Sequence, residues 1–243
     1  MTRSPRRMLA WLGPGDPLPD PSLAWHVPNG LLAASAQLSA ERLLEAYRRG
    51  IFPWYTSGQP VLWWSPDPRM VLHIGELRVS RSLRKTLRAV RRDARWRVTL
   101  DVCFERVMLE CAAPRADQDG TWITDAIRAG YGALHRLGAA HSVEVWNGEQ
   151  LVGGLYGVAL GRMFYGESMF AREPNASKVA LVSLARLLEA HEFSVIDCQQ
   201  STRHLASLGA REVPRAAFLE RVDELVRKPA PDWRTMRIEL PHA

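Results

Sequence analysis

An acid, a thiol and an amide stand on consecutive residues at the end of an apolar segment, residues 193–199 (FSVIDCQ). The apolar residues predict a buried strand, in which side chains alternate between the two faces of the sheet. Asp197 and Gln199 are therefore predicted to share one face, with Ile196 and Cys198 on the other. A carboxylate beside an amide can accept and orient a substrate amine, or the two can simply bind neighbouring backbone. The sequence leaves both interpretations open.

Two further places could carry chemistry. Glu167 lies beside a glycine inside an apolar strand pattern, YGESMF, where a carboxylate must be paired or functional because burying it alone is costly. Asn175, Ser177 and Lys178 stand at the start of a predicted helix, whose free N–H groups form a potential anion site. Cys198 is expected to pack in the core, since nothing nearby in the sequence lowers its pKa.

Other common chemistries have no motif in this chain. The seven histidines are scattered and no HExxH or CxxC pattern occurs, so we expect no metal site. No Walker loop and no G-x-S-x-G elbow is found. The glycines of 153–162 (GGLYGVALGR) lie in a strand pattern without the helix that a dinucleotide site requires, and they predict bulges or close approaches.

Hydrophobic periodicity and capping signals predict the elements that must position these residues. Ser39, Ser80, Thr124 or Asp125, and Asn175 are the predicted N-caps of helices. Asn147 and Gly148 predict a tight hairpin between two strands. The predicted helices are 40–49, a segment after Ser80, 101–115, 125–138, 176–190, 203–209 and 214–227, and the predicted strands are 141–146, 150–160, 163–170 and 193–199. This order describes an α+β fold with a central mixed sheet.

The totals bound the class of protein. A chain of 243 residues with 47% hydrophobic content can bury one large core or two smaller ones. Three cysteines without a CxxC pair are too few for a disulfide framework, which favours a reducing compartment. Apolar runs are short and no signal-peptide core is found, so we expect a cytoplasmic protein with no membrane segment. Five prolines between Pro5 and Pro21 predict an extended, irregular lead-in.

Positive charge is concentrated in one segment. The net charge is +6, yet residues 78–97 carry nine basic residues against one acid, or +8, which leaves −2 for the rest. Leu83, Leu87 and Val90 fall on one face of the predicted helix, so the basic residues cover its other faces. Such a stripe is either a solvated face or the electrostatic footprint of a nucleic-acid contact.

Aromatic residues gather between residues 50 and 72, where prolines and glycines forbid a long helix. They are Phe52, Trp54, Tyr55, Trp63 and Trp64. The cluster predicts either a small aromatic core under loops or a platform on which unpaired nucleotides stack.

Taken together, the motifs resemble the bacterial leucyl/phenylalanyl-tRNA–protein transferase family over roughly residues 17 to 219. The motifs, in order, are YRRGIFPWY, LWWSPDPR, SRSLRK, GTWIT, AHSVEVW, LVGGLYGVALG, GESMF, NASKVAL and IDCQ with HLASLGA. The resemblance implies a catalytic domain similar to the GNAT acyltransferase fold, residues 75–243, after a smaller N-terminal α/β domain, residues 1–74.

The resemblance also implies an activity. A member would move leucine or phenylalanine, and possibly methionine, from its tRNA to an N-terminal arginine or lysine of a protein, which marks that protein for degradation. The aminoacyl ester is already activated, so no cofactor is implied, and we expect a monomer. An α-amine with a pKa near 7.7–8.0 is partly protonated at neutral pH, and a nearby carboxylate would help it react.

Residue roles follow from the same resemblance. Asp197 would hold or deprotonate the acceptor amine, Gln199 would orient it, and Glu167 would help fix the basic acceptor. The donor side chain would lie among Leu155, Phe164, Met169 and Ile196, and the terminal adenosine near Trp54, Trp122 and Tyr131. The tRNA-binding candidates on the basic helix are Arg81, Arg84, Lys85, Arg88, Arg91 and Arg92. Ile196 and Asp197 can both line one site only if the strand twists or bulges there.

Two stretches depart from the pattern. Ser35, Ala36 and Gln37 stand where the family has Gly, Gly and Asp, and Ala171 stands where serine is usual. We expect the first to reshape an N-terminal loop and the second to remove a hydroxyl near the site. The nearest alternative, an acetyl-CoA-dependent N-acetyltransferase, would need a glycine-rich turn before the helix at Asn175, where this chain has FAREPNAS. A non-catalytic RNA-binding module is the other alternative.

Overall fold

Two β-sheets organise the computed structural model, which describes residues 8–113 and 121–242. The smaller sheet has the order β1-β2-β4-β3 and consists of β1 (Ala10–Leu12), β2 (Leu31–Ser35), β3 (Phe52–Pro53) and β4 (Val61–Trp64). The larger sheet has the order β11-β5-β10-β9-β8-β7-β6 and consists of β5 (Arg69–His73), β6 (Trp96–Leu100), β7 (Ala140–Asn147), β8 (Gln150–Leu160), β9 (Met163–Ala171), β10 (Val195–Gln199) and β11 (Arg211–Val213). Only β9 and β10 pair in parallel within the large sheet as described, so the predicted mixed sheet is confirmed.

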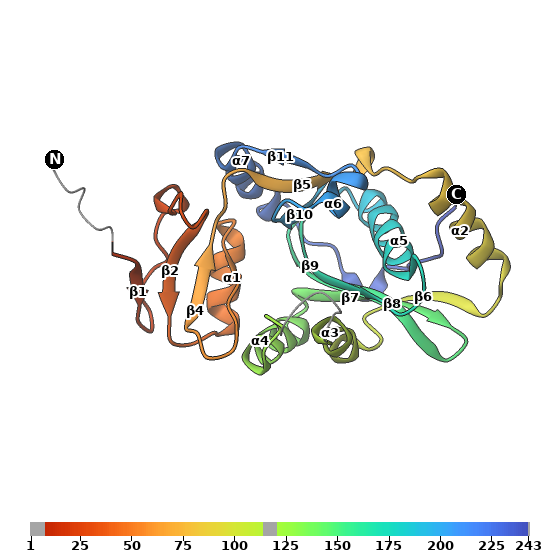
Figure 1. The fold of residues 1–243 in the computed structure, drawn as a ribbon, viewed down its shortest axis with the longest axis horizontal. Helices are drawn as coiled ribbons and strands as arrows, with labels where there is room; N and C mark the ends of the chain where they lie inside the picture. The colour runs from red at the N-terminus through yellow and green to blue at the C-terminus, as the bar shows by residue number, and fades with distance from the viewer. Residues whose placement is uncertain (1–7, 114–120, 243) are drawn as a thin grey trace.

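Helices cover both faces of the large sheet (Figure 1). They are α1 (Ala40–Arg48), α2 (Arg81–Arg92), α3 (Phe104–Ala112), α4 (Asp125–Arg136), α5 (Ala176–Ala190), α6 (Arg203–Ser207) and α7 (Arg215–Val226), with 3-10 turns at Pro21–Leu23, Ile74–Glu76 and Trp233–Thr235. The apolar sides of α2 and α5 share one buried cluster with the sheet. On the other face, α3, α4 and the small sheet share a second cluster with it. The two sheets are therefore joined by one continuous core.

Most of the predicted helix starts are confirmed by capping contacts. The hydroxyls of Ser39, Ser80 and Thr124 each accept a backbone N–H from the first turn of α1, α2 and α4. Asn175 is different, because its φ is +68° and its side chain makes no capping bond. Its amide instead donates to Thr86 on α2, and its oxygen accepts from Lys178.

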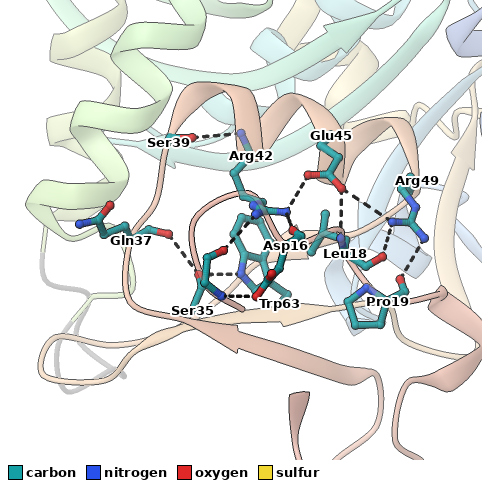
Figure 2. A network of polar contacts seen from close by, with 11 residues as sticks. Asp16, Leu18, Pro19, Ser35, Gln37, Ser39, Arg42, Glu45, Arg49 and Trp63 are labelled. Carbon is teal, nitrogen blue, oxygen red and sulfur yellow. Dashed lines mark hydrogen bonds and ion pairs between the residues drawn. The ribbon is translucent and has the colours of Figure 1, made fainter. Parts of the chain in front are cut away.

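The proline-rich lead-in is more regular than the sequence predicts. Pro5 lies outside the described residues, but β1 forms a short edge strand parallel to β2. After it, side chains of α1 satisfy the backbone of the irregular chain, as Figure 2 shows. Arg42 donates to the carbonyl of Asp16 at 2.6 Å, and Arg49 donates to the carbonyls of Leu18 and Pro19. The lead-in is thus held both by its own short elements, β1 and the 3-10 turn at Pro21–Leu23, and by side chains from α1 and its C-cap Arg49.

The departure at Ser35 is accommodated in the core of the small sheet. The Ser35 hydroxyl accepts the indole N–H of fully buried Trp63 at 3.0 Å and donates to the carbonyl of Gln37 at 3.1 Å (Figure 2). A glycine could not provide this partner for the indole. The serine therefore stabilises the loop before α1, and the expectation that this departure reshapes the loop stays a prediction.

The aromatic cluster is mostly core. Trp63, Trp64, Phe52 and Tyr55 are buried, and only Trp54 is substantially exposed, at 41%. A stacking platform built from all five rings is therefore wrong, because most of their faces are covered.

The boundary predicted at residue 74 cuts through the large sheet. β5 lies before that boundary, yet it pairs with both β10 and β11. The chain passes from the small sheet to the large one between Trp64 and Arg69. In the large sheet, β5 supplies the backbone hydrogen bonds for the edge of β10 that does not face β9.

Two β-bulges lie on neighbouring strands of the large sheet. Tyr156 pairs with Ser168 and Gly157 with Gly166, so Glu167 is an extra residue on β9. On β10 the partners of Asp197 and Gln199 are Val71 and Met70, which are adjacent, so Cys198 is an extra residue there. Gln199 then has a φ of +61°. The alternation of side chains between the two faces of the sheet is thus broken at Glu167 on β9 and at Cys198 on β10.

Gly157 allows the first bulge to form, because a Cβ there would overlap the Tyr165 carbonyl oxygen and lie 2.5 Å from the Phe164 ring. We predict that Gly157→Ala lowers the free energy of unfolding by about 3 kcal/mol, since strand backbone must move. Urea unfolding monitored by tryptophan fluorescence measures the change. Gly75→Ala is the control, because a Cβ added at Gly75 would meet no atom of the described residues within 4 Å. Equal stability of the two variants would contradict this role of Gly157.

Candidate active site

A cavity of about 1230 Å³ opens where the small sheet meets β9, β10, α5 and α6. Apolar side chains form most of its wall: Phe52, Leu72, Leu155, Phe164, Met169, Leu181, Leu184, Ile196 and Leu205. Glu167 and Gln199 bring polar groups to it, and Trp54 and Trp122 lie on it as well. An apolar cavity with a few convergent polar groups is the usual form of a small-molecule site.

The structure brings together most of the residues predicted to bind the donor. Leu155, Phe164, Met169 and Ile196 come from three different strands, and all four line the cavity. Two predicted residues do not line it. Tyr131 is fully buried, so it cannot stack on a nucleotide directly, and Asn175 is held against α2 at the start of α5.

Asp197 does not face the cavity, which corrects the prediction that it shares a face with Gln199. Its carboxylate and the Arg69 guanidinium are both fully buried and form a bidentate ion pair, with Arg69 Nε at 2.8 Å and Nη2 at 2.6 Å from its oxygens. Because Cys198 is the extra residue of the bulge, Cys198, Gln199 and Ile196 line the cavity while Asp197 points into the core. Asp197 therefore cannot contact an acceptor amine in this structure.

Asp197 instead fixes the conformation of Gln199. Besides binding Arg69, its Oδ1 accepts the backbone N–H of Gln199 at 2.8 Å. A left-handed backbone is unfavourable for a residue with a side chain, and this bond offsets part of the cost. The consequence is that the Gln199 amide reaches across to β9 and donates to Glu167 Oε1 at 2.8 Å.

Arg69 is a site-supporting residue that sequence reasoning missed. Its guanidinium carbon lies 4.7 Å from the ring centroid of Phe52 and 4.6 Å from that of Phe218, so it is held between two aromatic faces. Its Nη1 has no hydrogen-bond partner in the described part of the chain. The sequence does place an arginine at the start of the apolar segment RMVLH. A charge buried there needs a partner, and this could have predicted an ion pair.

Glu167 is the carboxylate that lines the cavity. The hydroxyls of Tyr47 and Tyr131 donate to its two oxygens at 2.6 and 3.0 Å, in addition to the bond from Gln199. Burial raises the pKa of Glu167 to about 7, although the three donors act in the opposite direction. The sequence indicated that this carboxylate must be paired or functional, and the structure confirms that it is paired.

Cys198, one of two cysteines on the cavity wall, is poorly suited to act as a nucleophile. Burial raises the pKa of Cys198 to about 12, so the sulfur is protonated at neutral pH. This agrees with the expected inert role of Cys198, although its position on the cavity wall was not expected.

Among the described residues no cluster of three or more histidine, cysteine, aspartate or glutamate side chains could hold a metal.

The basic helix α2 has the predicted amphipathic form. Leu83, Leu87 and Val90 are buried, and the six candidate tRNA-binding residues lie on its other faces: Arg81, Arg84, Lys85, Arg88, Arg91 and Arg92. None of these six forms an ion pair with any residue in 8–113 or 121–242. Their charge is therefore available to an anionic partner.

Ala171 lies at the exposed end of β9 and does not line the cavity, so a hydroxyl at that position would not face the site. The expectation that this departure removes a hydroxyl near the site is wrong.

In the described residues, none of the helices combines the length and apolar character that crossing a membrane requires.

Comparison with known proteins supports the sequence resemblance. A family model described as "Leucyl/phenylalanyl-tRNA protein transferase" matches residues 71–223, and a model of the N-terminal domain of the same family matches 36–67. The chain belongs to this family. A leucyl/phenylalanyl-tRNA–protein transferase from Cupriavidus taiwanensis is 61% identical over 232 residues, which cover 93% of each chain. One from Bordetella avium is 54% identical, over 93% of this chain and 92% of its own.

Among solved structures, a GCN5-related N-acetyltransferase from Kribbella flavida is similar to 67% of this chain with a TM-score of 0.35 and 10% identity. The match covers 56% of that protein.

We predict that Asp197→Asn lowers the free energy of unfolding by about 3–5 kcal/mol, because it leaves the buried Arg69 charge without its counter-ion. Urea unfolding measures the loss. Glu76→Gln, which breaks the half-exposed pair with Arg211, is the control and costs under about 1 kcal/mol. The double variant Arg69→Met with Asp197→Leu regains stability relative to Asp197→Asn, since no buried charge remains. If Asp197→Asn loses no more than the control, the pair does not have the proposed importance.

Proposed function

We propose that this protein transfers leucine or phenylalanine from aminoacyl-tRNA to the N-terminal arginine or lysine of an acceptor protein, as a monomer in the cytoplasm, and so marks the acceptor for degradation. One observation carries the proposal. The bulges of β9 and β10 place Glu167 and Gln199 in contact on the wall of a mainly apolar cavity. Family membership supports the same activity.

The apolar wall suits the donor's side chain. Leu155, Phe164 and Ile196 are rigid or branched, whereas Met169 adapts its shape and allows leucine and phenylalanine to share one cavity. Trp54 and Trp122 offer ring faces on which the terminal adenosine of the tRNA would stack.

The polar wall suits the acceptor. Gln199 and Glu167 present an amide and a carboxylate on which an N-terminal amine and a basic side chain would be held. Asp197, to which the family resemblance gave the amine, acts in this proposal by fixing Gln199. Positioning of this kind accounts for much of the rate of reactions between two bound groups.

Polar groups lie between α2 and the cavity. Thr86 on α2 bonds to Asn175 at the start of α5, and Lys178 follows one turn later. His204 lines the cavity, and its pKa is lowered by burial and by the charge of Lys178. An acceptor stem lying on α2 would follow these groups to bring its 3′ end to the cavity.

The transfer assay tests the function directly. We expect label to move from leucyl-tRNA to a peptide beginning with arginine, and not to a matched peptide beginning with glutamate. Gln199→Ala should reduce transfer by roughly 100-fold while the protein stays folded, because the amine loses its orientation. Tight tRNA binding without transfer would support an RNA-binding module instead. Activity only with acetyl-CoA would overturn the proposal.

Replacing Arg84, Lys85 and Arg88 together by alanine should weaken tRNA binding and flatten its salt dependence by roughly two to three ion contacts. Filter binding over a range of salt concentrations measures the slope. The matched control replaces Arg227, Lys228 and Arg234, which carry the same charge but are already paired with acids. An equal change of slope in both triple variants would show that only net charge matters.

A further inference from the structure

Three oxygen-bearing groups form a closed ring behind the cavity. Tyr47 on α1 contacts Glu167 Oε1 at 2.6 Å, and Tyr131 on α4 contacts Oε2 at 3.0 Å. The two phenol hydroxyls are also hydrogen-bonded to each other. Both tyrosines are fully buried, and Glu167 is partly buried on the cavity wall.

Counting protons shows how many this ring can hold. Its three oxygen–oxygen contacts need one proton each, and two phenols supply only two. When the carboxylate is ionised, one contact has lone pairs on both sides, which is unfavourable in a buried place. A third proton on Oε2, donated to Tyr131, lets Tyr131 donate to Tyr47 and Tyr47 donate to Oε1. The ring can therefore take up one more proton without losing any of its three contacts, although the two tyrosine donors by themselves favour the ionised carboxylate.

The charges around the ring permit this proton to come and go. Gln199 on β10 donates to Oε1, and the nearby Asp197 carboxylate disfavours a second negative charge on Glu167. Tyr156 on β8 is buried close to the Glu167 carboxyl group. Among the described residues, no cation forms an ion pair with that carboxyl group. Burial brings the pKa of Glu167 to about 7, where it exchanges a proton at physiological pH.

We propose that Glu167, held by Tyr47 and Tyr131, takes the proton that the acceptor's α-ammonium group must lose before it attacks the aminoacyl ester. The proposal rests on the transfer function above. The ammonium proton moves to Oε2 and completes the ring. The neutral amine then forms a C–N bond to the ester carbonyl carbon, the C–O bond to the tRNA ribose breaks, and the second amine proton leaves with the ribose oxygen. Glu167 afterwards returns its proton to solvent.

Asp197 and Cys198, the titratable neighbours of Glu167 on β10, are less suited to this step. Asp197 is sealed in its ion pair with Arg69, and the Cys198 thiol keeps its proton because its pKa is about 12. Glu167 lines the cavity and has a pKa near that of an α-amine, which is the condition for efficient proton transfer. Tyr47 and Tyr131 are positioning residues, since they act only through this carboxyl group.

Tyr47→Phe and Tyr131→Phe test the ring, because each removes one hydroxyl and keeps the aromatic packing. Each should raise the pKa of Glu167 by about one pH unit, since a lost hydrogen bond to a charged group is of that size. Carbon-13 NMR of protein labelled at glutamate carboxyl carbons measures the pKa, with Glu167→Gln identifying the signal. Tyr156→Phe is the control and should leave that pKa in place, because its hydroxyl has no partner among the described residues.

The pH profile of transfer tests the chemistry. In both phenylalanine variants, the acid limb of the kcat/KM profile should move to higher pH by as much as the pKa of Glu167 rises. The pKa of the free acceptor amine is the same in every assay, so it cannot cause this shift. Glu167→Gln should reduce transfer by roughly 100-fold at neutral pH. A Glu167 pKa near 4.5, or an acid limb that stays in place while the NMR value moves, would overturn the proposal. Absence of transfer at every pH would instead overturn the proposed function.

Discussion

The ion pair between Arg69 and Asp197 is the interaction on which the site depends. It joins β5 to β10 in the large sheet, with both side chains fully buried. Two buried charges are costly unless they are paired. The bidentate geometry and the rings of Phe52 and Phe218 against the guanidinium offset part of that cost, although Nη1 has no hydrogen-bond partner among the described residues. The pair also leaves Asp197 able to accept the Gln199 N–H, which turns that residue toward the cavity.

Several unfavourable features gather around this one point of the fold. Gln199 has a left-handed backbone, Glu167 is a carboxylate whose burial raises its pKa, and each neighbouring strand contains a bulge. Each of these costs stability, and each is held in place by the packed sheet around it. Such a concentration is typical of a functional site, where groups are held in a state that they would not adopt in solution. Asp197 therefore matters to the site without touching a substrate.

The small sheet takes part in the site rather than lying beside it. It shares a continuous core with α3, α4 and one face of the large sheet. α1 brings Tyr47 to Glu167, and the segment around β3 supplies Phe52 and Trp54 to the cavity wall. The parts matched by two separate family models therefore act as one structural unit around the cavity.

Local sequence determined the helices, the hairpin at Asn147 and Gly148, and the residue types of the site. Caps such as Ser80 act within one turn, and the apolar face of α2 follows from its 3.6-residue period, so neighbouring residues suffice to predict them. Only the tertiary structure decided which way the polar residues of β10 point. A bulge inserts one extra residue into a strand whose side chains alternate every two residues, and the position of the bulge depends on the partner strand. Simple alternation therefore predicted the wrong face for Asp197. Its partner Arg69 is 128 residues away, and the tyrosines of the Glu167 ring come from two other helices. Contacts of that length are determined by packing of the whole chain, which no local pattern records.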